Sequence, residues 1–353
     1  MTATNNTQPT RIQLLRKYIT TDQLGAEIGP FHSPVCPKSE GFNCLVVDAF
    51  SREQLLKDYA HDDYVMDRAN AIEEVDIVTT QPLGIALEAY AEEADAKLSS
   101  SKGCINYIVS SHNFEHQPNP IRFLQDAEAA IQPGGYLVMA IPIASRCFDC
   151  FQPLSRTGEL IDAYYLNRTK PSIGNVFDHK ASSSKLIGDE DINDVTYDVD
   201  KIVVRTFNGF IDLATFDSIK ASAEASYIDS HCWRFNPFLF ELIFSDLKAC
   251  GFFHHLTIKE IATNGSEFIV QIMRSDSPEE KSVLTAQQRT NLFKMSLKFQ
   301  FDDLLKHIPK EDSASTLDSE DILRNSTQNT RVNLGQSIIN WLERIAMKSM
   351  HSY

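Results

Sequence analysis

The fold is decided by residues 24–30, LGAEIGP, in which a short apolar run ends at Gly29. Such a run predicts a buried strand, and a glycine at its end lets the backbone come close to a ligand at the carboxyl edge of a sheet. A second apolar run, residues 44–47, is followed by Asp48, nineteen residues after Gly29. In a doubly wound sheet, this position allows a carboxylate to accept both hydroxyl groups of a ribose. The G-x-G-x-x-G pattern is absent, so a tight turn and a solvated aspartate remain the alternative on these residues alone.

Further apolar runs alternate with helical patterns along the chain. We expect strands at residues 74–79, 104–110 and 136–141, and helices at 51–60, 82–98 and 121–131. Near-continuous apolar strands separated by helices are typical of a parallel sheet covered on both faces. A helix at 236–250 and two strands at 254–261 and 267–273 follow, with an Asn-Gly turn signal between the strands. We therefore predict an α/β, doubly wound, seven-stranded sheet that is mostly parallel and ends in an antiparallel hairpin.

The same pattern divides the chain into four expected parts. These are a first core part (1–144), an insertion that forms a substrate lid (145–226), a second core part (227–276) and a helical tail (277–353). Apolar residues at helical spacing mark the tail: Leu334, Ile338, Leu342 and Ile345. Such a stripe packs on its own domain or on another chain. Packing on its own domain is the more usual outcome, and the less frequent one is a contact of the tail with a homo-oligomer or a protein partner.

Composition excludes several classes of protein. The chain has 353 residues, with 33 Lys+Arg against 48 Asp+Glu and a net charge of −15, which argues against nonspecific nucleic-acid binding. The longest apolar stretch, residues 136–144, contains Pro142 and is too short for a membrane span. No secretory signal is visible, and seven cysteines are an odd number that suggests free thiols. We expect a globular cytoplasmic protein.

A second informative stretch, residues 107–118, reads YIVSSHNFEHQP and leads to IQPGGYLVMAIP at 131–142. Together with EIGP at 27–30 and VVDAF at 46–50, these segments resemble class I S-adenosylmethionine-dependent methyltransferases in order and spacing. The resemblance covers residues 24–142 and 227–273. It implies a Rossmann-like fold, S-adenosyl-L-methionine as the cofactor and transferase activity of the EC 2.1.1 class. The residues it implies for cofactor binding are Glu27, Gly29, Pro30, Asp48, Ser111 and His112.

The chain departs from the family pattern in two places. Only Gly29 remains of the glycine-rich first motif, and fifteen residues lie between it and Leu45. We therefore expect a very short first crossover helix or a loop, with residues 31–34 covering the methionine end of the cofactor. Thr79-Thr80-Gln81 stands where the family often has an aspartate that contacts adenine. A polar side chain or the backbone would take that role.

Several segments narrow the resemblance and imply an acceptor. Residues 148–149, 160–164, 177–179 and 227–233 are similar to a bacterial branch associated with polysaccharide and glycan biosynthesis. The methyl acceptor expected from this similarity is a hydroxyl group of a sugar, a glycan or another small molecule.

Methyl transfer to a hydroxyl group often requires a base, and histidine titrates near neutral pH. His231 is the first candidate, with Asp229 to orient a ring or accept a substrate hydroxyl; the alternative is a histidine packed beside Trp233. His179 is the second candidate, and its alternative is a surface loop. His112 and His116 flank the end of the fourth strand, and either could be the base; the alternative for Glu115-His116 is a cap of the following helix. The residues expected to contact the acceptor are His116, Asp149, Asp178 and Trp233.

Two further hypotheses involve a metal and a different class of protein. Asp149, Asp178 and Asp229 are hard ligands that suit Mg²⁺, but their spacing shows no convergence, and we assign no metal ligand. The lone Cys147-x-x-Cys150 pair lacks the further ligands of a zinc site. The alternative function is a non-catalytic binding or scaffolding protein with the methyltransferase fold. A nicotinamide-dependent oxidoreductase is disfavoured by the missing glycines.

Overall fold

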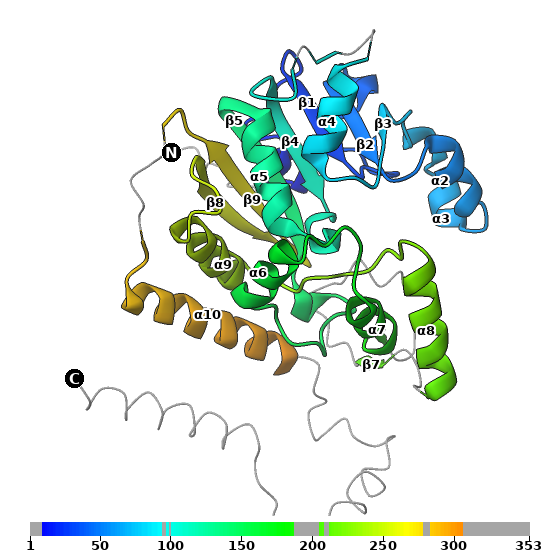
Figure 1. Cartoon of the computed structure of the whole chain (residues 1–353), viewed down its shortest axis with the longest axis vertical. Coiled ribbons are helices and arrows are strands. Elements are labelled where there is room, and N and C mark those ends of the chain that lie inside the picture. The colour runs from blue at the N-terminus through cyan, green and yellow to red at the C-terminus, as the bar shows by residue number, and fades with distance from the viewer. Residues whose placement is uncertain are drawn as a thin grey trace, which may run out of the picture. The chain divides into compact units, whose positions relative to one another are not determined.

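The protein contains a central seven-stranded sheet (Figure 1). The computed structural model describes residues 9–93, 97–98, 100–186, 205–207, 212–277 and 283–305. The strands of the sheet are β1 (Leu24–Ile28), β2 (Asn43–Asp48), β3 (Ile77–Val78), β4 (Ile105–Ser111), β5 (Ile131–Pro142), β8 (Leu256–Asn264) and β9 (Glu267–Arg274). Their order is β3-β2-β1-β4-β5-β9-β8. The first five strands are parallel, and β9 is antiparallel to both of its neighbours. The predicted mostly parallel sheet with a terminal hairpin is confirmed.

Helices connect and cover these strands. They are α1 (Arg11–Leu15), α2 (Arg52–Asp58), α3 (Asp63–Met66), α4 (Leu83–Ala91), α5 (Pro120–Ala130), α6 (Thr157–Tyr165), α7 (Ile173–Ala181), α8 (Leu213–Ala225), α9 (Pro237–Ala249) and α10 (Ala286–Leu305). Polar residues begin two of the predicted helices, because the Ser51 and Asn236 side chains accept hydrogen bonds from backbone N–H groups in the first turn. The helix expected at 82–98 ends earlier, at Ala91.

Each central strand buries alternate residues on opposite faces of the sheet. In β4, Ile108 packs in the larger core with α4, α5 and α9, and Val109 packs in a smaller core on the other face. In β5, Met139 packs in the larger core and Ala140 packs in the smaller one. Figure 1 shows α4 and α5 lying across one face of the sheet. Burial on both faces explains why these strands are continuous apolar runs.

The crossover from β1 to β2 holds only a short 3₁₀ turn, Lys38–Glu40, between the two strands. This confirms the expected loss of the first crossover helix. The second face is covered instead by α1 and by this loop, which bury Leu15 and Val35 in the smaller core. Ala26 and Ile28 of β1 face the larger core, so Glu27 between them faces the loop and accepts hydrogen bonds from its backbone.

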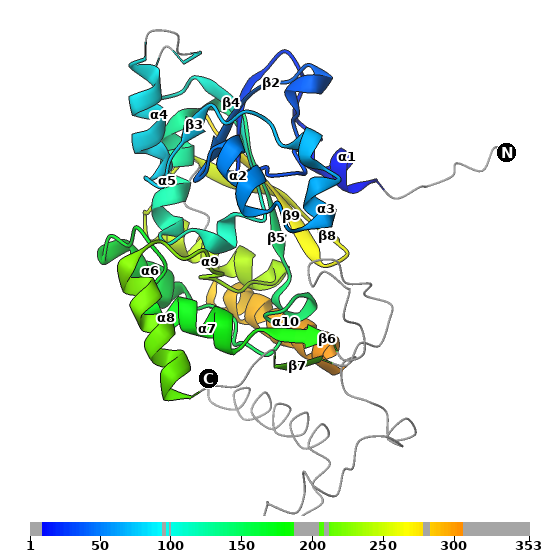
Figure 2. The same ribbon diagram turned by 90° about the vertical axis from the view of Figure 1, so that its right-hand side faces the viewer.

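The segment after β5 forms α6, α7, α8 and a small hairpin of β6 (Ser184–Leu186) and β7 (Arg205–Phe207). Both views place these elements together beyond the carboxyl end of β5 (Figures 1 and 2). Helix α10 packs against α9. Within the described residues, no helix combines the length and apolar character that crossing a bilayer requires. The stripe predicted at 334–345 lies outside the described residues.

Candidate functional site

A cavity of about 320 Å³ lies where β1, β2 and β4 end. Its wall combines the ends of these strands with the loop before α9: Ile28, Gly29, Phe31, Val47, Asp48, Ala49, Phe50, Leu55, Tyr59, Thr79, Thr80, Gln81, Leu83, His112, Asn113, His116, Gln117, Pro118, Phe123, Thr169, Tyr227 and Asp229. A second cavity of about 270 Å³ shares part of this wall. Ligands of open α/β sheets bind at this edge, where the strand order reverses between β1 and β4.

Gly29 forms the part of the wall that follows β1. Its φ is +60°, a left-handed conformation that favours glycine, and its N–H donates to the carbonyl oxygen of Val47 at 2.8 Å. A Cβ at this position would have only the Asn113 amide within reach, at 3.5 Å. The glycine thus provides a turn that keeps the cavity open beside the end of β2.

Asp48 ends β2 in the wall of the same cavity. Its Oδ1 accepts a hydrogen bond from the Phe50 backbone N–H at 3.1 Å, and burial raises the pKa of the carboxyl group. A carboxylate beside the Gly29 turn fits the role of accepting ribose hydroxyl groups. Thr79, Thr80 and Gln81 line the next part of the wall, where the family often has an aspartate.

Three of the residues predicted to bind the cofactor lie outside the cavity wall. Glu27 is 1% exposed, and its carboxylate accepts hydrogen bonds from the backbone N–H groups of Val35 and Cys36 at 2.7 and 2.9 Å. Ser111 Oγ accepts a hydrogen bond from Arg11 at 2.7 Å, and Pro30 also is not part of the wall. Glu27 and Ser111 therefore have structural partners on the α1 side of the molecule.

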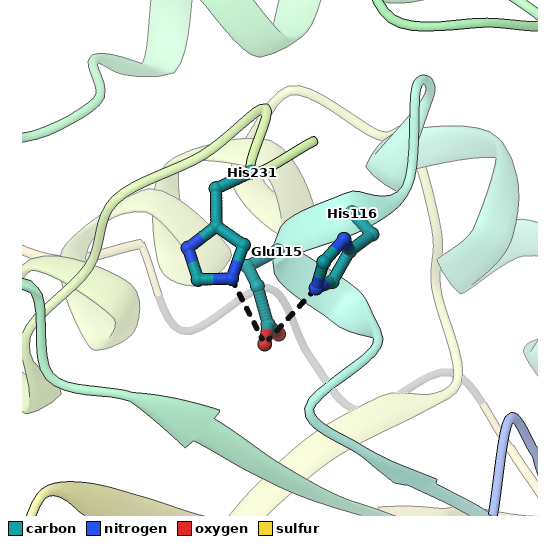
Figure 3. A group of neighbouring side chains, drawn as sticks. All are labelled: Glu115, His116 and His231. Atoms are coloured by element: carbon teal, nitrogen blue, oxygen red, sulfur yellow. Dashed lines mark ion pairs between the residues drawn. The ribbon is translucent and has the colours of Figure 1, made fainter. Parts of the chain in front are cut away.

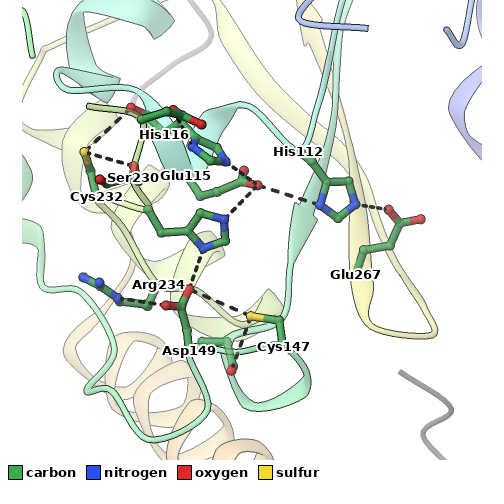
Figure 4. Close-up of polar contacts among 12 residues, drawn as sticks. His112, Glu115, His116, Cys147, Asp149, Ser230, Cys232, Arg234 and Glu267 are labelled. Carbon is green, nitrogen blue, oxygen red and sulfur yellow. Dashed lines mark hydrogen bonds and ion pairs between the residues drawn. The ribbon is translucent and has the colours of Figure 1, made fainter. Parts of the chain in front are cut away.

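Three histidines near the end of β4 each pair with a different carboxylate. His112 Nε2 is 2.8 Å from Glu267, His116 Nδ1 is 2.9 Å from Asp229, and His231 Nδ1 is 2.6 Å from Asp149. His112 has a φ of +50°, and both His112 and His116 line the cavity. Figure 4 shows His112 between two carboxylates, Glu267 on one side and Glu115 on the other.

Glu115 lies at the centre of these three rings. Its side chain is 1% exposed, and Oε1 is 3.8 Å from His112 Nδ1, 3.8 Å from His116 Nε2 and 4.0 Å from His231 Nε2. Figure 3 shows the rings of His116 and His231 pointing at this carboxylate. Neither of its oxygens has a hydrogen-bond partner among the described residues. From the sequence, Glu115 is expected only as part of a helix cap, but α5 is capped by Asn119.

The predicted catalytic residues lie near this cluster, but Asp229 pairs with His116 and not with His231. Asp229 orients the ring of His116; burial opposes the positive charge of that ring, but Asp229 outweighs it and raises the pKa of His116 to about 9. His231 is 6% exposed and is not part of the cavity wall. Its ring centroid is 5.7 Å from that of His179, and burial together with His231 lowers the pKa of His179 to about 4.

The residues expected to contact an acceptor separate into three groups. His116 lines the cavity, whereas Asp149 is buried behind His231. Trp233 is buried and donates its indole N–H to the Gln117 carbonyl oxygen at 2.6 Å, which is a structural contact. Asp178 is exposed on α7. The three aspartates considered for Mg²⁺ therefore do not meet at one point, since Asp149 and Asp229 serve different histidines.

Comparison with known proteins is consistent with this geometry. Residues 24–181 match the family model described as a methyltransferase domain. The match makes this part of the chain similar to a methyltransferase domain, and S-adenosylmethionine is the cofactor that it indicates. The wall around Gly29 and Asp48 fits that cofactor. No curated protein matches the chain.

Solved structures with a similar arrangement have low sequence identity. A putative S-adenosylmethionine-dependent methyltransferase of Methanococcus maripaludis is 10% identical, with 75% of this chain and 83% of that chain covered and a TM-score of 0.33. A methyltransferase of Methanosarcina mazei is 13% identical, with 74% and 96% covered and a TM-score of 0.31. A putative zinc-dependent alcohol dehydrogenase of Rhodobacter sphaeroides is 12% identical, with 76% and 91% covered and a TM-score of 0.36. No function follows from these scores.

Proposed function

We propose that this protein is an S-adenosylmethionine-dependent methyltransferase whose acceptor is a hydroxyl group of a sugar, a glycan or another small molecule. One observation carries the proposal: a single cavity joins Gly29 and Asp48, which suit the cofactor, to His116 and Asp229. A nucleotide-like ligand and a polar acceptor would meet in this cavity. A protein that only binds or scaffolds would have no need for histidine–carboxylate pairs at its edge.

The bound cofactor supplies a methyl group on a sulfonium centre for in-line displacement. When the bond from methyl to sulfur breaks and the bond to the acceptor oxygen forms, a residue of this chain would have to take up the hydroxyl proton. Gly29 keeps the cofactor end of the cavity open, and Asp48 accepts the ribose hydroxyl groups. Alignment of the reacting atoms and removal of the proton are the two contributions that the protein must make.

The histidine–carboxylate cluster at the acceptor end of the cavity supplies the second contribution, removal of the proton. In the simplest form of the proposal, His231 is the base. It lies behind the cavity wall, with its ring centroid 4.6 Å from that of His116, so the proton reaches it past His116, and Asp149 orients its ring through Nδ1 at 2.6 Å. The pair of His116 and Asp229 lies in the cavity wall and contacts the acceptor. His179 packs beside His231 as its neighbour in the insertion.

Calorimetric titration with S-adenosylmethionine and S-adenosylhomocysteine tests the cofactor site. We expect saturable binding by the wild type and a loss of roughly 10- to 100-fold in affinity for Asp48→Ala, because a hydrogen bond to a charged group contributes about 1.5–3 kcal/mol. Asp58→Ala, which removes an exposed carboxylate from α2, is the matched control. If the wild type binds neither ligand, the proposal is wrong and a binding or scaffolding function is favoured.

Turnover tests the acceptor end. With labelled cofactor and a panel of glycan acceptors, His231→Ala should lower the rate by about 10²- to 10⁴-fold, the usual contribution of a general base. Cofactor affinity should stay the same, since His231 does not line the cavity. Full turnover by this variant would exclude His231 as a catalytic residue.

A further inference from the structure

Glu115 is a buried carboxylate whose nearest polar neighbours are too distant for hydrogen bonds. It is 0% exposed, and the ring nitrogens that face it lie 3.8–4.0 Å from Oε1. Hydrogen bonds between nitrogen and oxygen have lengths of about 2.7–3.2 Å. Among the described residues, neither oxygen of Glu115 has a hydrogen-bond partner. A buried charge of this kind is costly unless something else binds it.

Two of the three histidines around Glu115 have one further feature in common. His116 and His231 each use Nδ1 for a carboxylate, which leaves Nε2 facing Glu115. Histidines that bind metals almost always donate the other ring N–H to a carboxylate, a carbonyl group or water, and this bond fixes the tautomer and the ring orientation. Asp149, at 1% exposure, is a buried partner of this kind for His231.

We propose that Glu115, His116 and His231 form a binding site for a divalent transition-metal ion. Their ligand atoms all lie within 4.8 Å of one another. An ion midway between His116 Nε2 and Glu115 Oε1, which are 3.8 Å apart, would be about 1.9 Å from each, close to the roughly 2.0–2.2 Å of zinc bonds to nitrogen and oxygen. Imidazole ligands suit zinc, iron, nickel and copper, whereas magnesium and calcium prefer sites made of oxygens.

Three protein ligands leave at least one position open on the ion, as in catalytic zinc sites. His116 lines the cavity, so the ion would lie at the acceptor end, opposite the cofactor wall. An acceptor oxygen bound there would be oriented and would lose its proton more readily. In this form of the site His231 acts as a ligand rather than as a base. The role in the reaction rests on the proposed function, whereas metal binding itself does not.

The competing interpretation is an ion-pair network in which protonated histidines neutralise Glu115. Both interpretations place positive charge beside this carboxylate, but only the metal site requires an added ion. The two differ in what Glu115→Gln does. Glutamine has the same shape as glutamate but no charge. In an ion-pair network it would remove an ion pair and so lower stability, whereas in a metal site it would remove a ligand and so lose the bound ion.

Equilibrium dialysis of the full-length protein, first stripped with a chelator and then exposed to Zn²⁺ or Co²⁺, tests the proposal by elemental analysis. We expect about one ion per chain, and a Co²⁺ visible absorption band. Glu115→Gln and His231→Gln should lose the bound ion, and Asp149→Asn should weaken binding by about 10- to 100-fold, as outer ligand partners do. His61→Gln, which changes an exposed histidine of the loop before α3, should bind as the wild type does.

Thermal unfolding gives a second measurement of metal binding, which also shows whether each variant is folded. Glu115→Gln should be at least as stable as the stripped wild type, because its carboxylate has no hydrogen-bond partner to lose, and added Zn²⁺ should raise the melting temperature of the wild type but not that of Glu115→Gln. Absence of both bound ion and melting shift in the wild type would overturn the metal site. Metal binding without binding of S-adenosylmethionine would retain the metal site and reject the proposed function.

Discussion

At Gly29, the backbone conformation rather than the space around it makes the residue special. The φ of +60° is strained for any residue with a Cβ, yet the nearest atom to such a Cβ is 3.5 Å away. We predict that Gly29→Ala lowers the free energy of unfolding by about 1 kcal/mol and weakens cofactor binding by shifting the turn. Urea unfolding and calorimetry measure the two effects.

Gly158 in α6 is the matched control. A Cβ there meets no atom within 4 Å, and its φ is not in the left-handed region. Gly158→Ala should stabilise the protein by about 0.5–1 kcal/mol, because alanine favours helix and restricts the unfolded chain. Equal effects of the two substitutions would contradict the argument from backbone strain.

Glu27 gives a pH dependence with a definite sign. Burial raises the pKa of Glu27 from 4.5 to about 7, although the Val35 and Cys36 N–H groups act in the opposite direction. The folded state then binds a proton that the unfolded state has lost, so this group's contribution to stability is present below pH 4.5 and is lost as the pH rises through 7. We predict that Glu27→Gln makes unfolding less dependent on pH between 4.5 and 7, as measured by urea titrations across that range. An unchanged slope would show that Glu27 does not titrate there.

The position of a residue in the cavity could be predicted from the sequence where it depends on the pattern of neighbouring residues. Gly29 and Asp48 end adjacent strands, and the structure places both in one cavity. The role of Glu115 was not predictable, because it depends on His231, which approaches from a loop more than a hundred positions away in the sequence. The partner of His231 is likewise Asp149, 82 positions away, and not the nearby Asp229.

At the scale of elements, Asn236 connects two helices. Its Oδ1 accepts the Leu239 N–H at 3.0 Å and caps α9, and its amide donates to the Ser296 carbonyl and hydroxyl oxygens of α10, each at 3.0 Å. We predict that Asn236→Ala lowers the free energy of unfolding by about 2–3 kcal/mol, the sum of a cap and a buried hydrogen bond. Chemical denaturation measures this loss.

Asn119 separates the two contributions. It caps α5 by accepting the Arg122 N–H at 3.1 Å, at an exposed position. Asn119→Ala should cost only about 1 kcal/mol, the value of a cap alone. Asn236→Ser should fall between the two alanine variants, because serine keeps a capping oxygen and loses the amide donor. If Asn236→Ala costs no more than Asn119→Ala, the bonds to Ser296 contribute nothing to stability.

Strands were easier to predict than their exact limits. The run at 24–28 is β1 as expected, since both of its faces are buried. Strand β5 begins at Ile131 rather than at residue 136, because Ile131 pairs with Ile105 before an irregularity in the register, and the Pro-Gly-Gly segment is carried within the strand. Pairing with a neighbouring strand overrides the local turn signal here.

At the scale of the whole molecule, α10 brings the end of the described chain back to the sheet. A helical segment was expected after residue 276, but its docking was not, because the contacts join residues about 157 positions apart. Asp303 accepts hydrogen bonds from Arg146 at 2.7 and 3.2 Å and from Ser145 at 2.9 Å, just after β5. The segment that follows β5 is thus anchored by a helix that follows β9.

This anchor should contribute more to stability than the ion pair between Arg289 of α10 and Asp246 of α9. Side-chain exposure is 13% for Arg146 and 5% for Asp303, so Asp303→Ala leaves a largely buried guanidinium without its carboxylate, a change that costs about 3–5 kcal/mol. Arg289 pairs with Asp246 at 2.8 Å but is 54% exposed, and Arg289→Ala should cost no more than about 1 kcal/mol. Urea unfolding compares the two variants, and limited proteolysis under native conditions should cut α10 faster only in Asp303→Ala. Equal losses would mean that α10 is held by its apolar contacts with α9, and that the start of the insertion does not depend on it.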